Sequence, residues 1–121
     1  MRVVRGLREL AASLSRGAPP TVAHVDLSGS TPLCANIMCA KLGEPCVCRL
    51  AGVLEECAER QPNVTTLSLE NCQLRAVPEA VFLFSRLETL NLKRNLLDAR
   101  VQEQSRVAAF KRLPALRVIE F

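Results

Sequence analysis

The sequence predicts an α/β fold in which about four short parallel strands alternate with helices or turns on one face of the sheet. The prediction rests on a sequence motif that occurs twice. Residues 64–74 and 87–97 both read apolar-x-x-Leu-x-Leu-x-x-(Asn or Cys)-x-Leu, and their central leucines, Leu67 and Leu90, are 23 residues apart. Alternate residues of a strand point to opposite faces, so the Leu-x-Leu step places both leucines on one face. A strand this short needs a neighbouring strand to be stable, which predicts that the copies pair side by side.

Weaker copies of the pattern flank the two clear ones. Residues 22–30 align with residues 64–72, with Ser30 in the turn position, and residues 113–121 align with residues 84–92. Strands are therefore expected at roughly 24–28, 66–70, 89–93 and 118–121.

The turns and return segments complete the predicted repeats. Asn95 stands where the second clear copy turns, and its side-chain amide can bond backbone groups that the turn leaves unpaired. Cys72, at the matching position of the first copy, is expected to be a small buried residue. The leucines expected to be fully buried are Leu67, Leu69, Leu74, Leu87, Leu90, Leu92 and Leu97. The return segment is expected to close the core from behind with Val77, Val81 and Phe84.

This pattern resembles the leucine-rich-repeat family. Five positions agree in type between the two clear copies, and the turn position holds Asn95 in one and Cys72 in the other, as that family does. The order of a helix and then a strand over residues 50–64 resembles its ribonuclease-inhibitor-like and cysteine-containing branches. The resemblance implies a short leucine-rich-repeat solenoid with a concave face of strands and a convex face of helices or turns. It also implies binding of other proteins, although a fold alone does not give a function.

Residues 3–15 read as an amphipathic helix. Its apolar stripe consists of Val3, Leu7, Leu10 and Leu14, and arginines occupy the other faces. Gly17 and the two prolines after it end the helix. Two interpretations stay open: a helix that caps the first strand, or an arginine-rich, acid-poor mitochondrial targeting sequence. We expect residues 1–20 to form this helix and a linker, and residues 21–121 to form the repeat domain.

An irregular, cysteine-rich insert at residues 31–48 separates the first strand from the second. Its cysteines, in the spacing C-x4-C-x6-C-x-C, are Cys34, Cys39, Cys46 and Cys48. This spacing differs from the C-x2-C pairs typical of zinc sites and shares only its first step with plant-type iron–sulfur proteins. Unlinked thiols are favoured over disulfides, zinc or a cluster, because no secretory signal indicates an oxidising compartment. After the insert, residues 49–59 read as a helix whose apolar face includes Cys57.

Composition narrows the function classes. The chain of 121 residues fits one small domain, and an aromatic content of 3% predicts an aliphatic core. We expect no transmembrane helix, because no apolar run approaches the roughly 18 residues that one needs. The net charge of +4 comes from scattered arginines, which makes nucleic-acid binding unlikely to be the role. An intracellular location is expected, either mitochondrial or cytoplasmic.

The sequence offers a binding surface and no catalytic motif. The single histidine, His24, stands near Asp26 and Ser28, but residues two apart on a strand need not form a catalytic triad. We therefore expect no enzymatic activity and no cofactor. The candidate partner-binding residues occupy outward strand positions, the turns after them and the chain end: His24, Asp26, Ser28, Ser68, Glu70, Asn91, Lys93, Glu120 and Phe121.

The last convex segment and the last strand suggest where a partner could sit. In residues 98–112, we expect Val101, Phe110 and either Val107 or Ala108 to face the core. The strand after it leaves an open edge with Phe121 exposed, which a partner could cover. The chain is thus predicted to be a non-catalytic protein-interaction module, an accessory or structural subunit of a larger assembly. The alternative is a metal- or cluster-binding assembly factor that uses the cysteines of the insert.

Overall fold

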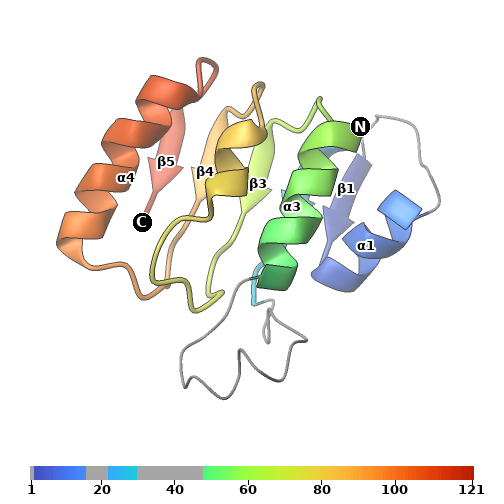
Figure 1. The fold of residues 1–121 in the computed structure, drawn as a ribbon, viewed down its shortest axis with the longest axis horizontal. Coiled ribbons are helices and arrows are strands. Elements are labelled where there is room, and N and C mark those ends of the chain that lie inside the picture. The colour runs from blue at the N-terminus through green and yellow to red at the C-terminus, as the bar shows by residue number, and fades with distance from the viewer. Residues whose placement is uncertain (1, 16–21, 30–47) are drawn as a thin grey trace.

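Figure 1 shows a parallel sheet with its helices gathered on one face. The structure is a computed structural model, which describes residues 2–15, 22–29 and 48–121. Its elements in chain order are β1 (Arg2–Arg5), α1 (Leu7–Ser15), β2 (Val22–Asp26), α3 (Cys48–Arg60), β3 (Thr66–Ser68), the 3-10 helix η1 (Glu79–Leu83), β4 (Thr89–Asn91), α4 (Ala99–Arg112) and β5 (Val118–Glu120). The five strands lie side by side in the order in which the chain visits them.

The predicted α/β class with a parallel sheet is confirmed. Each strand pairs with the next in a register that brings one inward apolar side chain of every strand into a row. This row consists of Val4, Val25, Leu67, Leu90 and Ile119. The expected strands correspond to β2, β3, β4 and β5, the expected helix at residues 49–59 corresponds to α3, and the return segment after β3 contains η1.

The N-terminal helix is shorter than predicted, because Arg2–Arg5 form a fifth strand. The predicted helix over residues 3–15 is wrong in its first turn and correct in the remainder. Gly6 separates strand from helix with a φ of +86°, a left-handed conformation that glycine adopts without steric cost. Val4 is buried and pairs with β2, and its branched side chain favours extended backbone. The division of the chain at residue 20 stays a prediction.

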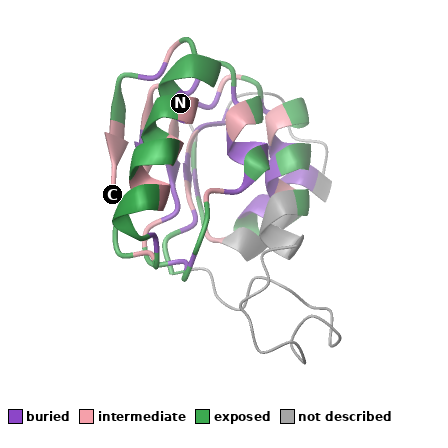
Figure 2. Cartoon of the chain, turned by 60° about the vertical axis from the view of Figure 1, so that its left-hand side comes forward, coloured by how far each residue is buried: buried purple, intermediate pink, exposed green. Residues whose placement is uncertain are grey.

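The core lies between the sheet and the helices (Figure 2). The leucines predicted to be buried are all buried: Leu67, Leu69, Leu74, Leu87, Leu90, Leu92 and Leu97. Behind them, Val81 and Phe84 are buried as predicted, and Val77 is half-buried against the same core. The core is therefore chiefly aliphatic, as the low aromatic content predicts.

One side chain joins two neighbouring turns. The Asn95 amide nitrogen donates to the carbonyl oxygens of Leu69 at 2.8 Å and Leu92 at 2.9 Å. Its oxygen accepts from the backbone N–H groups of Cys72 at 2.9 Å and Leu74 at 3.1 Å. The predicted role of Asn95 is confirmed, and it extends to the turn after β3 as well as its own.

Helix α4 turns a different face to the core from the one predicted. The Asp98 carboxylate caps the helix by accepting a hydrogen bond from the Val101 N–H at 2.8 Å. Val101 packs against the core as predicted, and Ala109, further along the same helix, is buried in that core. The expectation that Phe110 faces the core is wrong, because its side chain is 47% exposed. Of the two alternatives Val107 and Ala108, Val107 is 60% exposed and Ala108 is half-buried. A small residue at the contact lets a helix lie close to the layer beneath it, which leaves bulkier neighbours outside.

We predict that Leu90→Ala lowers the free energy of unfolding by about 2–5 kcal/mol, because it leaves a cavity in the inward row. Urea denaturation of both proteins measures the difference. The matched control is Leu96→Ala, at a leucine that is 55% exposed, which should change stability by no more than about 0.5 kcal/mol. Equal losses in the two variants would contradict the assignment of the row.

We predict that Asn95→Ala costs about 1–3 kcal/mol, because it leaves backbone groups of two turns without partners. Asn95→Asp separates the two halves of the amide. It keeps oxygen acceptors for Cys72 and Leu74 but loses the donors to Leu69 and Leu92, so it should also destabilise the protein. Thermal unfolding checks both variants, and an unchanged midpoint in either would show that the bonds do not carry stability.

Candidate functional site

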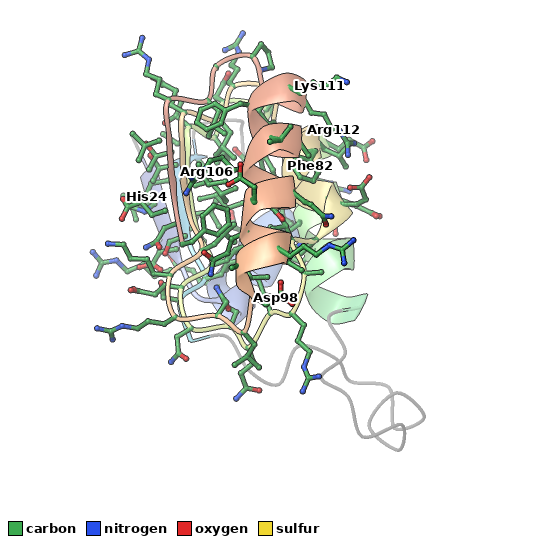
Figure 3. All side chains as sticks on the ribbon, turned by 90° about the vertical axis from the view of Figure 1, so that its left-hand side faces the viewer. His24, Phe82, Asp98, Arg106, Lys111 and Arg112 are labelled. Carbon is green, nitrogen blue, oxygen red and sulfur yellow. The ribbon has the colours of Figure 1, made fainter. Side chains whose placement is uncertain are left out.

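The face of the sheet opposite the helices carries no covering element among the described residues (Figures 1 and 3). His24 in Figure 3 lies on the side of the sheet away from α4. The register arranges the outward side chains of this face in two rows. The first row is Val3, His24, Thr66, Thr89 and Val118, and the second is Arg5, Asp26, Ser68, Asn91 and Glu120. We call these two rows, with Ser28, Glu70 and Lys93 in the turns beside them, the open face.

The structure brings together on the open face all the predicted binding residues except Phe121. Phe121 follows β5 and is half-buried against the core, so the expectation that its ring is exposed is only partly met. The guanidinium of Arg106 in α4 lies 5.5 Å from the centroid of this ring. Phe121 therefore belongs to the C-terminal edge of the sheet rather than to the open face.

A hydrogen-bonded network fixes the centre of the open face. The hydroxyl oxygens of Ser28 and Ser68 lie 2.9 Å apart, and the Asn91 amide nitrogen donates to the Ser68 hydroxyl at 3.4 Å. The Asn91 oxygen also accepts from the Lys93 backbone N–H at 3.0 Å. These hydrogen bonds hold the three side chains in one arrangement on the sheet.

Charges of both signs surround this network. Lys93 Nζ lies 2.6 Å from Glu120 Oε2, and hydrogen bonding and attraction to that carboxylate raise the pKa of Lys93. A second pair joins Arg94 Nε and Glu70 Oε1 at 4.0 Å. Ion pairs at exposed positions contribute little to stability. These charged groups can therefore exchange ion-pair partners at low cost.

Asp26 is the acidic group of the second row nearest β1. Its carboxylate accepts a hydrogen bond from the Ser28 backbone N–H at 3.1 Å. Hydrogen bonds from the Ser28 side chain and backbone lower the pKa of Asp26, and His24 and Arg5 lower it further, while partial burial opposes them. Asp26 therefore presents a negative charge at neutral pH.

The sequence places His24 near Asp26 and Ser28, and the structure shows the contacts of each of these residues. Asp26 engages the backbone of the turn after β2, and the Ser28 hydroxyl lies beside Ser68. His24 lies beside Thr66 in the register. All three residues therefore take part in contacts of the turn and of the strand pairing.

The cysteine hypotheses concern residues outside the described part of the chain. Cys34, Cys39 and Cys46 lie in residues 30–47, and the placement of the Cys48 side chain is not described either. No group of histidine, cysteine and acidic residues within residues 2–15, 22–29 and 48–121 is placed to hold a metal ion. A metal or cluster at the insert stays a prediction. In that same part of the chain, no helix has the length and hydropathy to cross a membrane.

The two cysteines whose side chains the structure describes, Cys57 and Cys72, are both buried. Burial, aided by the nearby Glu56 charge, raises the pKa of the Cys57 thiol to about 12. The Cys72 Sγ donates to the Leu27 carbonyl oxygen at 3.1 Å. A protonated, buried thiol is a poor nucleophile and a poor metal ligand, so the reading of both residues as packing is supported.

The sequence reading missed the two side chains that β1 adds to the open face, Val3 and Arg5. The signal was present as two consecutive valines before Gly6, but the same residues also fit a helical stripe. It also missed a cluster on the helix side, where the Arg112 guanidinium bonds both Glu79 carboxylate oxygens, at 2.9 and 3.0 Å, and lies 4.5 Å from the Phe82 ring centroid (Figure 3). This cluster fastens α4 to η1.

Comparison of the chain with family models, with curated proteins and with solved structures finds no match in any of the three. The leucine-rich-repeat resemblance therefore rests on the sequence pattern alone.

We predict that Asp26→Asn lowers the free energy of unfolding at pH 7. A carboxylate whose folded-state pKa lies below its unfolded value stabilises the fold above the unfolded pKa, here 3.8, and this contribution is lost as the pH falls through the folded-state pKa. The difference between wild type and variant should therefore shrink on acidification below pH 3.8. Denaturation at a series of pH values measures it. Glu103→Gln, on the exposed side of α4, is the control and should change stability by no more than about 0.5 kcal/mol at pH 7.

Proposed function

We propose that this chain is a non-catalytic protein-interaction module of the leucine-rich-repeat type, built as a short solenoid. In this proposal it is an accessory or structural subunit of a larger protein assembly, located in the cytoplasm or in mitochondria. Its partners are other protein subunits rather than nucleic acid. They bind through the open face and through the C-terminal edge formed by β5 and Phe121.

The observation that carries the proposal is a face of the parallel sheet that no described element covers. Parallel sheets occur almost only with both faces covered, because the helices that connect their strands pack on both sides. Here the helices lie on one face and the other presents polar and charged side chains. Repeat proteins use such a strand-lined surface for binding, because its side chains stand at fixed spacing on a rigid sheet.

The chemistry of the open face fits a protein partner. The hydrogen bonds among Ser28, Ser68 and Asn91 hold donors and acceptors in place. Around them, acidic groups such as Asp26 and Glu120 alternate with basic groups such as Lys93. A surface of mixed sign favours a partner with complementary charges of both signs over a polyanion, which calls for a basic patch.

We predict that Thr66→Arg abolishes recovery of the natural partner when the tagged chain is isolated from its own cells. Thr66 stands on the central strand and points outward, so the larger side chain projects from the open face without entering the core. Recovery, measured by quantitative mass spectrometry, should fall about tenfold or more, the loss expected when a bulky charge blocks the centre of an interface.

The matched control is Glu103→Arg, which adds an arginine to the exposed side of α4. It should leave partner recovery within about twofold of wild type. Circular dichroism verifies that both variants fold. A partner recovered equally well with Thr66→Arg, or lost equally with Glu103→Arg, would refute the open face as the binding surface.

A further inference from the structure

Among the residues that the structure describes, the sheet has two free edges, because β1 and β5 each pair with a described strand on one side only. On β5, the Val118 N–H donates to the Glu88 oxygen at 3.0 Å, and the Glu120 oxygen accepts from the Leu92 N–H at 2.8 Å. Successive residues of a strand direct their backbone groups to alternate sides. The N–H and C=O of Ile119 therefore point away from β4, toward the free edge.

On the β1 edge, the backbone groups that point outward belong to residues that can pair with Ile119. The Gly6 N–H donates to the Asp26 oxygen at 2.7 Å. The alternation then turns the backbone groups of Val4 toward β2 and those of Val3 and Arg5 outward. In a parallel pair, one residue bonds to the two residues that flank its register partner. Ile119 is thus placed to bond to Val3 and Arg5 of a β1 strand laid beside β5.

The outward side chains of the two edges are complementary as well. Val3 and Val118 are 45% and 44% exposed, and they stand at opposite ends of a row whose interior positions are polar. Apolar cross-strand pairs stabilise a sheet when the strands meet. In the next row, Arg5 stands at one end and Glu120 at the other, with opposite charges.

We propose that β5 of one copy of this chain pairs in parallel with β1 of a second copy. The pairs across the contact are Ile119 with Val4, Val118 with Val3, and Glu120 with Arg5. Figure 1 places β5 and α4 at one end of the molecule and β1 and α1 at the other. The contact is therefore head-to-tail, and each added copy leaves a free edge for the next. This inference rests on the part of the proposed function that makes the C-terminal edge a binding surface, and it names the partner there.

The helix layer beside β5 offers apolar surface for the same contact. Arg106 of α4 lies over the Phe121 ring, and Phe110 follows it by one helical turn. Side chains four residues apart lie on the same side of a helix. The exposed Phe110 ring is therefore on the side of α4 that faces Phe121. A second copy seated on β5 removes part of these rings from water.

Glu9 opposes this association. Its carboxylate accepts a hydrogen bond from the outward Arg5 N–H at 3.2 Å. An arriving β5 strand must displace Glu9, because the oxygen of Ile119 would take the same N–H. The contact is exposed, so displacement costs little and association is weakened rather than prevented.

Sedimentation velocity of the full chain at increasing concentration tests the proposal. The wild type should form species larger than a monomer, whose share grows with concentration. Arg5→Glu and Glu120→Arg each place like charges across the contact, so each should weaken association about tenfold or more. An equal mixture of the two variants should associate again, because every contact then joins opposite charges. Glu9→Ala should strengthen association.

The matched control is Glu70→Arg, which makes the same charge change on the open face but away from both edges. It should change association by no more than about twofold. A wild type that stays monomeric up to about 1 mM overturns the proposal, because at that concentration even an association with a binding free energy of only about −4 kcal/mol would be substantially populated. Unchanged association of Arg5→Glu overturns the proposal too, because it would indicate a contact without Arg5, such as one between two β5 strands. An equal mixture of the two variants that fails to associate also overturns it.

The failure of this proposal can be told apart from failure of the proposed function. Thr66→Arg alters the open face far from both edges, so it should abolish partner recovery and leave self-association within about twofold of wild type. A monomeric wild type whose partner is lost with Thr66→Arg would reject the head-to-tail contact alone. A self-associating chain whose partner recovery resists Thr66→Arg would reject the open face alone.

Discussion

Everything else in this structure depends on the row of inward aliphatic side chains that runs across the five strands. Strands of three residues, such as β3 and β4, gain too little from their own hydrogen bonds to persist alone. Leu67 and Leu90 are fully buried in this row, and each buried side chain of this size contributes roughly 1.5–3 kcal/mol. A shift of one residue in the pairing register would move the leucines to the face that is exposed to water. The register that keeps them buried also decides which polar residues meet on the open face.

The features that depend on a few consecutive residues could be predicted from the sequence. The Leu-x-Leu alternation predicted β3 and β4, and the position of Asn95 predicted its bonds to the turns, because both follow from local geometry. β1 could not be predicted in this way, since the spacing of Val3 and Leu7 also fits a helix and only the conformation of Gly6 decides between them. The buried side of α4 depends on how closely the helix approaches the sheet, a distance that no local pattern contains.

The residues that β2 to β5 contribute to the candidate site could be predicted from the sequence, but their arrangement and the residues of β1 could not. Alternation placed Ser68 and Asn91 outward, but the contact between the Ser28 and Ser68 hydroxyls joins residues 40 positions apart and requires the register of β2 with β3. Arg5 was missed together with β1. Phe121 was chosen for its place at the last strand, and the structure separates it from the other candidates because it lies on the inner side of the sheet. The insert cysteines lie outside the described residues, so their role remains a hypothesis from spacing.

The spatial order of the strands, identical to their order along the chain, has a consequence for dynamics. Each unit is held by its immediate neighbours in sequence, so an outer strand can detach by breaking one interface while an inner strand must break two. Local opening is therefore easiest at β1 and β5 and hardest around β3, where amide protons are protected longest from exchange with solvent. The two outer strands of the described sheet are thus also its least tightly held parts.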